Sequence, residues 1–375
     1  MTEIEELSID PFDRHGRLVE IGPRPWMLVR GSRRWQVVVG ALGALAVAAV
    51  VVAAFVLPII EGRLVTRFVA LSVALVGLQF VTGPSGQLSL CHGVFVGVGS
   101  YTTTILVARL HVHHVVGLIG APVAGFVVGC LVGTLALRIR ATYLGPVTLG
   151  VAVAFPMILK RFAWFTGGSS GLPLPREAHP PSWFGDSAAR THQWTHLLIV
   201  AIAVVAFAIA RNLQRSTVGL SVQAVADNSL SAAASGINVR RTRVLAYGWG
   251  AAFGALGGAL LVLDTPIVGA DNYDLFRSLG YFAVVMVGGA ALMSGAVFGA
   301  ALLVTVPWLI ATFDVGAAPN LVLGALLVAA TLAAPGGVAP GIARWCSVVV
   351  EVREPMLRRA SPTSSTRTGA RRVTS

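Results

Sequence analysis

The chain has 375 residues, of which 55% are apolar and only 12% are charged, and its mean hydropathy is +0.78. A soluble protein carries about a quarter charged residues, so this composition excludes a soluble enzyme and predicts an integral membrane protein. The formal net charge is +12, which often indicates nucleic acid or anionic lipid as a partner. Here the arginines fall between apolar runs, so we interpret them as topology signals and expect the lipid bilayer, and no nucleic acid, as partner.

The apolar runs, taken in chain order, predict ten transmembrane helices. A helix needs about 20 apolar residues to cross the hydrocarbon core, and the runs lack the alternating pattern of a membrane β-barrel. The fold class is therefore predicted as all-α, a polytopic transmembrane helical bundle. The predicted spans are residues 36–58, 64–81, 88–108, 115–137, 143–163, 196–212, 243–263, 279–293, 294–313 and 320–337.

The eighth and ninth of these spans are the least separated. Only Met293, Ser294 and Gly295 interrupt the apolar run between them. Two separate spans and one re-entrant hairpin are both compatible with this pattern.

Arginine and lysine give an independent test of the count, because they are enriched in cytoplasmic loops. With a cytoplasmic amino terminus, the predicted inner segments hold 20 of the 28 basic residues. Both termini are therefore predicted to be cytoplasmic. Arg67 and Arg109 lie near predicted outer ends, from which their long side chains can reach water.

Polar segments divide the chain into three parts. Residues 1–35 form a cytoplasmic N-terminal arm, residues 36–342 a transmembrane domain, and residues 343–375 a basic tail rich in Ser, Thr and Arg that we expect to be disordered. The first apolar run begins too late for a cleaved signal peptide, so its span is expected to remain as an anchor. Within the domain, residues 164–195 form an outer loop with several prolines, and residues 211–243 form an inner loop.

The inner loop carries a predicted helix of its own. Residues 218–234 are rich in alanine and contain no proline, which favours a short helix along the membrane surface. Gly236 is expected to end it. A bundle needs no such helix merely to connect two spans, so we interpret it as a docking element for a soluble partner, with an ordinary amphipathic surface helix as the alternative.

The sequence lacks the residues that a self-powered transporter or an enzyme would need. No acidic residue lies at the centre of a predicted span, and His92 is the one candidate for a proton relay. The only lysine, Lys160, does not follow a nucleotide-binding glycine-rich loop. Cys91, Cys130 and Cys346 are scattered and predict neither a disulfide nor a zinc site. We therefore expect no catalytic site, no metal site and no cofactor bound by this chain.

Polar residues are concentrated around one break in the apolar pattern, the sequence Gly-Pro-Ser-Gly-Gln at residues 83–87. Broken helices expose backbone groups that transporters use to bind solutes. Polar groups at membrane depth are costly unless used, so we predict that Gln87, Ser89, His92 and Tyr101 belong to a solute pathway. The alternative is a tight turn followed by a small-residue packing face, formed by Gly93, Gly97 and Gly99.

Five stretches carry a common pattern in chain order. Residues 86–102 read GQLSLCHGVFVGVGSYT, and the others are residues 143–150, 166–172, 227–239 and 288–301. Together they resemble the permeases of branched-chain amino acid ABC transporters of the LivM type. The resemblance covers roughly residues 80–340.

The resemblance implies a complex in the bacterial cytoplasmic (inner) membrane. Its partners would be a second related permease chain, two cytoplasmic subunits that use ATP and Mg, and an extracytoplasmic solute-binding protein. Thr148, in the second stretch, would join the solute pathway. The ATPase-coupling loop would comprise Asp227, Asn228, Ala232, Ala233 and Gly236.

The resemblance also implies the solute. The chain is expected to import a small amphiphilic solute, most simply a branched-chain amino acid. Cys91 stands where the family has glycine, and Ser229 and Ala233 stand where its coupling loop has acids, so urea, short amides or another small solute remain alternatives. A proton-coupled secondary carrier that uses His92 is a further hypothesis. A membrane enzyme acting on lipid would need a cluster of reactive groups at one membrane face, which the sequence does not show.

Overall fold

The computed structural model describes residues 33–137, 144–174, 187–265, 267–313, 324, 325 and 329. The chain divides into two units. The first, Met1–Val39 with Cys346–Ser375, includes only the beginning of helix α1 among the described residues. The second, Gly40–Trp345, carries the bundle.

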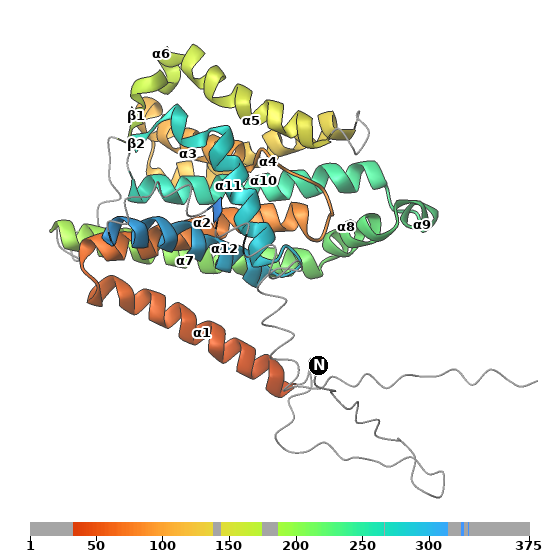
Figure 1. Ribbon diagram of the computed structural model, residues 1–375, viewed down its shortest axis with the longest axis horizontal. Coiled ribbons are helices and arrows are strands. Elements are labelled where there is room, and N and C mark those ends of the chain that lie inside the picture. Colours follow the sequence, from red (N-terminus) through yellow and green to blue (C-terminus); the bar gives the residue numbers. More distant parts are fainter. Residues whose placement is uncertain are drawn as a thin grey trace, which may run out of the picture. The chain divides into compact units, whose positions relative to one another are not determined.

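The described residues form long helices and one two-stranded sheet of two residues per strand (Figure 1). Strand β1 (Leu172–Pro173) pairs antiparallel with β2 (Ile267–Val268). The helices are α1 (Arg33–Val56), α2 (Ile59–Thr82), α3 (His92–Leu110), α4 (His114–Leu137), α5 (Leu144–Arg161), α6 (Ala163–Thr166), α7 (Ala188–Arg215), α8 (Thr217–Asp227), α9 (Ser229–Ala234), α10 (Val239–Asp264), α11 (Leu275–Gly288) and α12 (Met293–Thr312), with 3-10 turns at Gly168–Ser170 and Ala270–Tyr273.

Six described helices are long and apolar enough to cross a membrane, namely α2, α3, α4, α7, α10 and α12. The pair Gly145–Arg161 and Ala163–Ser170 is bent by 84° and gives a seventh if it is counted as one span. The all-helical bundle is therefore confirmed. The count of ten and the cytoplasmic location of both termini remain predictions, and the tenth predicted span lies almost wholly outside the described residues.

Helix α10 runs through the middle of the bundle and packs against α2, α3 and α4 (Figure 1). Small residues permit these contacts, because lipid is as apolar as leucine and helices in a membrane associate through close packing. A Cβ atom built on Gly99 of α3 would lie 1.8 Å from the Ala255 carbonyl oxygen. A Cβ atom built on Gly258 of α10 would lie 2.0 Å from the Val96 carbonyl oxygen. The predicted packing role of Gly99 is confirmed.

The break between the eighth and ninth predicted spans was placed wrongly. Helix α11 ends at Gly288, and α12 begins at Met293. The turn falls at Gly289, whose φ of 102° is open to glycine and strained for other residues. The two segments are separate helices that pack against each other.

Two helices extend beyond the predicted spans into polar residues that flank them. Helix α7 covers Ala188–Arg215 instead of 196–212, and α10 begins at Val239 instead of 243. Ser187 caps α7 by accepting a hydrogen bond from the Arg190 backbone, and Asn238 caps α10 in the same way from Arg241. The caps explain where these two helices begin.

The single helix predicted at residues 218–234 is also wrong: the segment forms two helices. Asn228 interrupts it with an extended backbone, and its side-chain oxygen accepts hydrogen bonds from the first amides of α9. Gly236 ends the second helix as predicted, with a φ of 82° and a hydrogen bond from its amide to the Ala233 carbonyl. We call the end of the bundle that carries α8 and α9 the loop end, and the end that carries β1 and β2 the strand end.

Candidate functional site

The segment after α2 folds back onto that helix. The Gly83 amide bonds to the Gln79 carbonyl at 2.8 Å, and the Gln87 amide bonds to the Val81 carbonyl at 3.1 Å. The Gln87 side chain donates to the Ser85 hydroxyl at 3.1 Å and is partly buried. The freed carbonyls at this helix end are therefore satisfied locally.

Ser89 and His92 lie in the packed core and are 0% exposed. His92 Nε2 lies 2.8 Å from the Ala74 carbonyl oxygen, and a carbonyl only accepts, so this nitrogen carries a proton. A Cβ on Gly254 of α10 would lie 3.0 Å from the ring. His92 thus sits where α2, α3 and α10 meet, and its Nδ1 is buried without a partner among the described residues.

Thr148 joins the same region from α5. Its hydroxyl accepts a hydrogen bond from the Leu90 amide at 3.3 Å and donates to the Gly145 carbonyl at 2.9 Å. The structure thus brings Thr148 to the segment that carries Ser89. This neighbourhood is at the amino-terminal end of α3.

Tyr101 lies further along α3 and does not join this group. Its hydroxyl donates to the Val268 carbonyl of β2 at 3.5 Å, and its ring meets Tyr273 edge-on with centroids 6.1 Å apart. Burial raises the pKa of Tyr273 above its ordinary value, so that phenol is neutral. The five predicted pathway residues therefore do not form one cluster.

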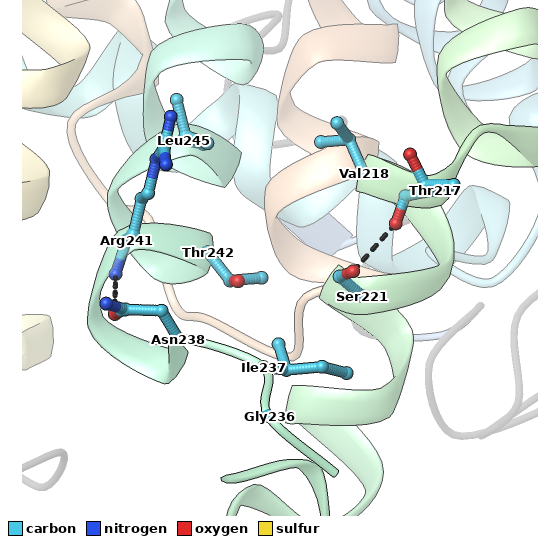
Figure 2. A pocket seen from close by; sticks show the side chains of 9 residues that line it. All are labelled: Thr217, Val218, Ser221, Gly236, Ile237, Asn238, Arg241, Thr242 and Leu245. Carbon is cyan, nitrogen blue, oxygen red and sulfur yellow. Dashed lines mark hydrogen bonds between the residues drawn. The ribbon is translucent and has the colours of Figure 1, made fainter.

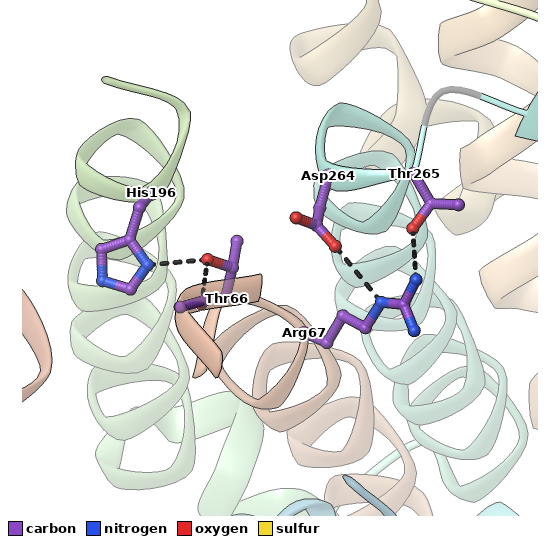
Figure 3. A network of polar contacts seen from close by, with 6 residues as sticks. Thr66, Arg67, His196, Asp264 and Thr265 are labelled. Atoms are coloured by element: carbon purple, nitrogen blue, oxygen red, sulfur yellow. Dashed lines mark hydrogen bonds and ion pairs between the residues drawn. The ribbon is translucent and has the colours of Figure 1, made fainter. Parts of the chain in front are cut away.

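A polar network at the strand end was not predicted (Figure 3). Asp264, the last residue of α10, is only 5% exposed. Its carboxylate accepts a hydrogen bond from Arg67 Nε at 3.2 Å, and Arg67 Nη2 donates to the Thr265 hydroxyl at 3.1 Å. Arg67 is therefore an ion-pair partner across the bundle, and its side chain, 46% exposed, also reaches the surface.

His196 adds its own helix, α7, and helix α1 to this network. Its Nε2 lies 3.0 Å from the Val50 carbonyl of α1, and its Nδ1 lies 2.7 Å from the Thr66 hydroxyl of α2. Nε2 must donate to the carbonyl, because a carbonyl oxygen only accepts. The Thr66 hydroxyl, which has one proton, lies within hydrogen-bonding distance of both His196 Nδ1 and the Gly62 carbonyl, 2.9 Å away. Two buried atoms nearby, Asp264 Oδ1 and His192 Nε2, have no partner among the described residues.

The predicted coupling residues lie on α8, α9 and the turn that follows. Asp227, Asn228, Ala233 and Gly236 are exposed, whereas Ala232 is 4% exposed and packs inward. Sequence reasoning missed Leu230, which is 82% exposed on α9. An isolated large apolar side chain on a polar loop was the signal that could have identified it.

A groove of about 320 Å³ opens between α8, this turn and α10 (Figure 2). Its lining combines hydroxyl, amide and apolar side chains with one guanidinium: Thr217, Val218, Ser221, Gly236, Ile237, Asn238, Arg241, Thr242 and Leu245. Ser221 and Asn238 are engaged in bonds within their own helix ends. The groove therefore offers a mixed polar and apolar surface at the loop end.

Comparisons with known proteins indicate one family of transport proteins. The family profile described as "Branched-chain amino acid transport system / permease component" matches residues 60–331. The chain is 27% identical over 293 residues to the high-affinity branched-chain amino acid transport system permease protein LivM of Escherichia coli (strain K12), covering 70% of this chain and 66% of that protein. It is 24% identical over 276 residues to LivH of the same strain, covering 70% of this chain and 89% of that protein.

A weaker similarity reaches a different transporter. The chain is 27% identical over 114 residues to the galactofuranose transporter permease protein YtfT of Escherichia coli (strain K12), covering 30% of this chain and 33% of that protein. No solved structure matches the chain. The chain spans 66% of two of the LivM proteins that it matches, slightly less than two thirds of their length.

Proposed function

The chain belongs to the branched-chain amino acid transport permease family, and from this premise we propose that it is the membrane subunit of an ABC importer for branched-chain amino acids. Family permeases are transport subunits without an ATPase domain, and the apolar helices place the chain in the cytoplasmic membrane as a multi-pass protein. The profile match over residues 60–331 carries the proposal.

The proposed complex contains a second permease chain, two cytoplasmic ATP-binding subunits and an extracytoplasmic solute-binding protein. The LivM and LivH relatives support this composition, since both are named as permeases of one type of transport system. ATP and Mg would be used by the ATP-binding subunits only.

The α8–α9 loop is the proposed contact with an ATP-binding subunit. Asp227, Asn228, Ala233 and Gly236 are exposed there, and Leu230 presents an apolar side chain to the partner. Ala232 is buried, so in this proposal its side chain packs inward and does not touch the partner. A short helix with one apolar anchor fits a groove on a partner surface.

The proposed solute pathway includes Gln87, Ser89, His92, Tyr101 and Thr148. Support comes from the concentration of polar groups around the break between α2 and α3, where Ser89 and Thr148 are both fully buried. Buried polar groups in a membrane are costly and mark functional regions. In the described conformation Ser89, His92 and Thr148 are fully buried, so opening of the pathway there requires movement of the surrounding helices.

Reconstitution tests the proposal directly. The purified chain is placed in vesicles alone and with its partner subunits, and uptake of labelled leucine, isoleucine, valine and urea is followed. We expect leucine-type uptake that requires the binding protein, both permeases and ATP on the ATPase side.

The alternatives give different results. Uptake of urea with the same requirements would replace the solute and keep the mechanism. Uptake by the chain alone, driven by a pH gradient, would refute the ABC proposal. A His92→Gln variant would then show whether that imidazole is the relay.

A further inference from the structure

Two glutamines connect three elements at the loop end of the bundle. Gln214 of α7 donates from Nε2 to Gln79 Oε1 of α2 at 3.0 Å. Gln79 Nε2 in turn donates to the Ala290 carbonyl oxygen, in the turn between α11 and α12, at 2.9 Å. The hydrogen bonds run in one direction, from α7 through α2 to the α11–α12 turn.

Burial makes this connection specific. Gln79 is 0% exposed, and both its amide oxygen and its amide nitrogen have partners on other elements. A buried amide without partners would cost about 1–3 kcal/mol, so this side chain favours the one arrangement in which α7 and the α11–α12 turn both meet α2. Apolar side chains cannot impose such a register, because they pack equally well against lipid.

The backbones of α2 and of the α11–α12 turn also approach each other closely here. A Cβ built on Gly83, the residue that ends α2, would lie 1.9 Å from the Ala290 carbonyl oxygen. The end of α2 and the α11–α12 turn therefore touch directly. Any movement of α2 here displaces that turn.

Gln214 also lies where α7 leads into the α8–α9 loop. It lies in the last turn of α7, two residues before Ser216, whose side chain accepts a hydrogen bond from Gly219 at the start of α8. Helix α8 packs against α7 and α10 and has no comparable contact with α2. The Gln214–Gln79 hydrogen bond is therefore a polar side-chain connection from the last turn of α7, where the loop begins, to α2.

We propose that Gln79 and Gln214 are positioning residues that transmit movement of the α8–α9 loop to α2 and to the α11–α12 turn. A force applied to α8 moves the last turn of α7, and the amide chain carries that displacement into the core. The inference rests on the proposed function for its transport readout. Its structural readout is independent of any solute.

Methionine gives the most selective test, since it keeps the length and flexibility of glutamine but lacks the amide. Gln214→Met removes the bond to α2 and leaves the bond from Gln79 to Ala290. Gln79→Met removes both. Asn212→Met is the matched control, because Asn212 is exposed in the same turn of α7.

The transport arm uses the full complex with its partner subunits. After normalising to assembled complex, we expect Gln214→Met to hydrolyse ATP but to move roughly threefold to tenfold less leucine per ATP, the effect of losing one interhelical hydrogen bond in a membrane. Asn212→Met should match the wild type. In the double variant Gln79→Met/Gln214→Met the losses should not multiply, because linked residues are non-additive. The proposal would be overturned if Gln214→Met moved as much leucine per ATP as the wild type. It would also be overturned if the loss in the double variant equalled the product of the two single losses.

The structural arm uses hydrogen exchange on the full chain in detergent. Gln214→Met should increase exchange in the turn at residues 289–292, far from the substitution in sequence, and Asn212→Met should not. Unchanged exchange there would refute the link. If the wild-type complex fails to take up any solute while this exchange result holds, the proposed function fails and the link stands.

Discussion

The contact between α3 and α10 gives the sharpest test of how the bundle is packed. A Cβ on Gly99 would lie 1.8 Å from the Ala255 carbonyl oxygen, and Cβ atoms essentially never come closer than 3.0 Å to another atom. In a Gly99→Ala variant the two helices must therefore separate by at least about 1.2 Å, the difference between these distances. The obstacle is backbone, which cannot rotate away as a side chain can.

The cost follows from known effects of overpacking. Inserting a methyl group into a packed core costs about 1–3 kcal/mol, and a backbone obstacle places Gly99→Ala toward the upper part of that range. Alanine recovers up to about 1 kcal/mol through its better helix propensity. The net destabilisation expected is about 1–2 kcal/mol.

Gly150→Ala in α5 is the matched control, since no atom lies within 4 Å of a Cβ built there. This variant should be neutral or gain up to about 1 kcal/mol. The assay is the fraction of monodisperse protein that remains in detergent after a series of heating steps. We expect a midpoint lower by roughly a few degrees for Gly99→Ala than for Gly150→Ala. Equal midpoints would show that the close approach of α3 and α10 does not hold.

Three further substitutions have defined outcomes. Asp264→Ala should reduce stability by about 1 kcal/mol or less and so lower the heating midpoint only slightly, because the Arg67 side chain is 46% exposed and water screens the pair. A large fall in the midpoint would mean that the carboxylate has other partners. Gly236→Leu should be expressed normally yet take up less leucine per ATP, because a φ of 82° costs a branched residue about 1–2 kcal/mol; full uptake would contradict a coupling role. Asn228→Ala should speed hydrogen exchange in α9 without changing the heating midpoint, since a lost cap costs about 0.5–2 kcal/mol locally; unchanged exchange would show that the cap is dispensable.

Helix existence was predictable because apolar runs of bilayer length leave few alternatives. Helix boundaries were not, since the predicted spans followed hydropathy and stopped at the first polar residues. Helix α7 begins at Ala188, eight residues before the predicted start at 196. Ser187 was the available signal, because serine before a helical segment is a preferred cap.

The pairs that join distant helices could not be read from one sequence. Arg67 and Asp264 are 197 residues apart, and Gln79 and Gln214 are 135 residues apart. Each of these residues, considered alone, is compatible with a side chain that reaches water or a neighbouring loop. Only the fold shows that each lies opposite a partner.

His92 shows how far the sequence alone could predict the candidate site. Its position in an apolar run predicts an intramembrane imidazole, and the structure places the ring, 0% exposed, where three helices meet. Polarity in a span does not distinguish a pathway residue from a side chain that bonds to a neighbouring carbonyl. That distinction depends on conformations in which the pathway is open.

Helix α2 is held differently at its two ends, and this difference bears on how the loop could move it. Near the strand end, Thr66 and Arg67 bond to α7 and α10, while near the loop end Gln79 bonds to α7 and the α11–α12 turn. Because the ties at the strand end do not involve the loop, a displacement that enters at Gln79 acts on α2 as a lever about its opposite end. Gln214→Met should therefore affect the loop end alone, and hydrogen exchange around Thr66 should stay at the wild-type rate.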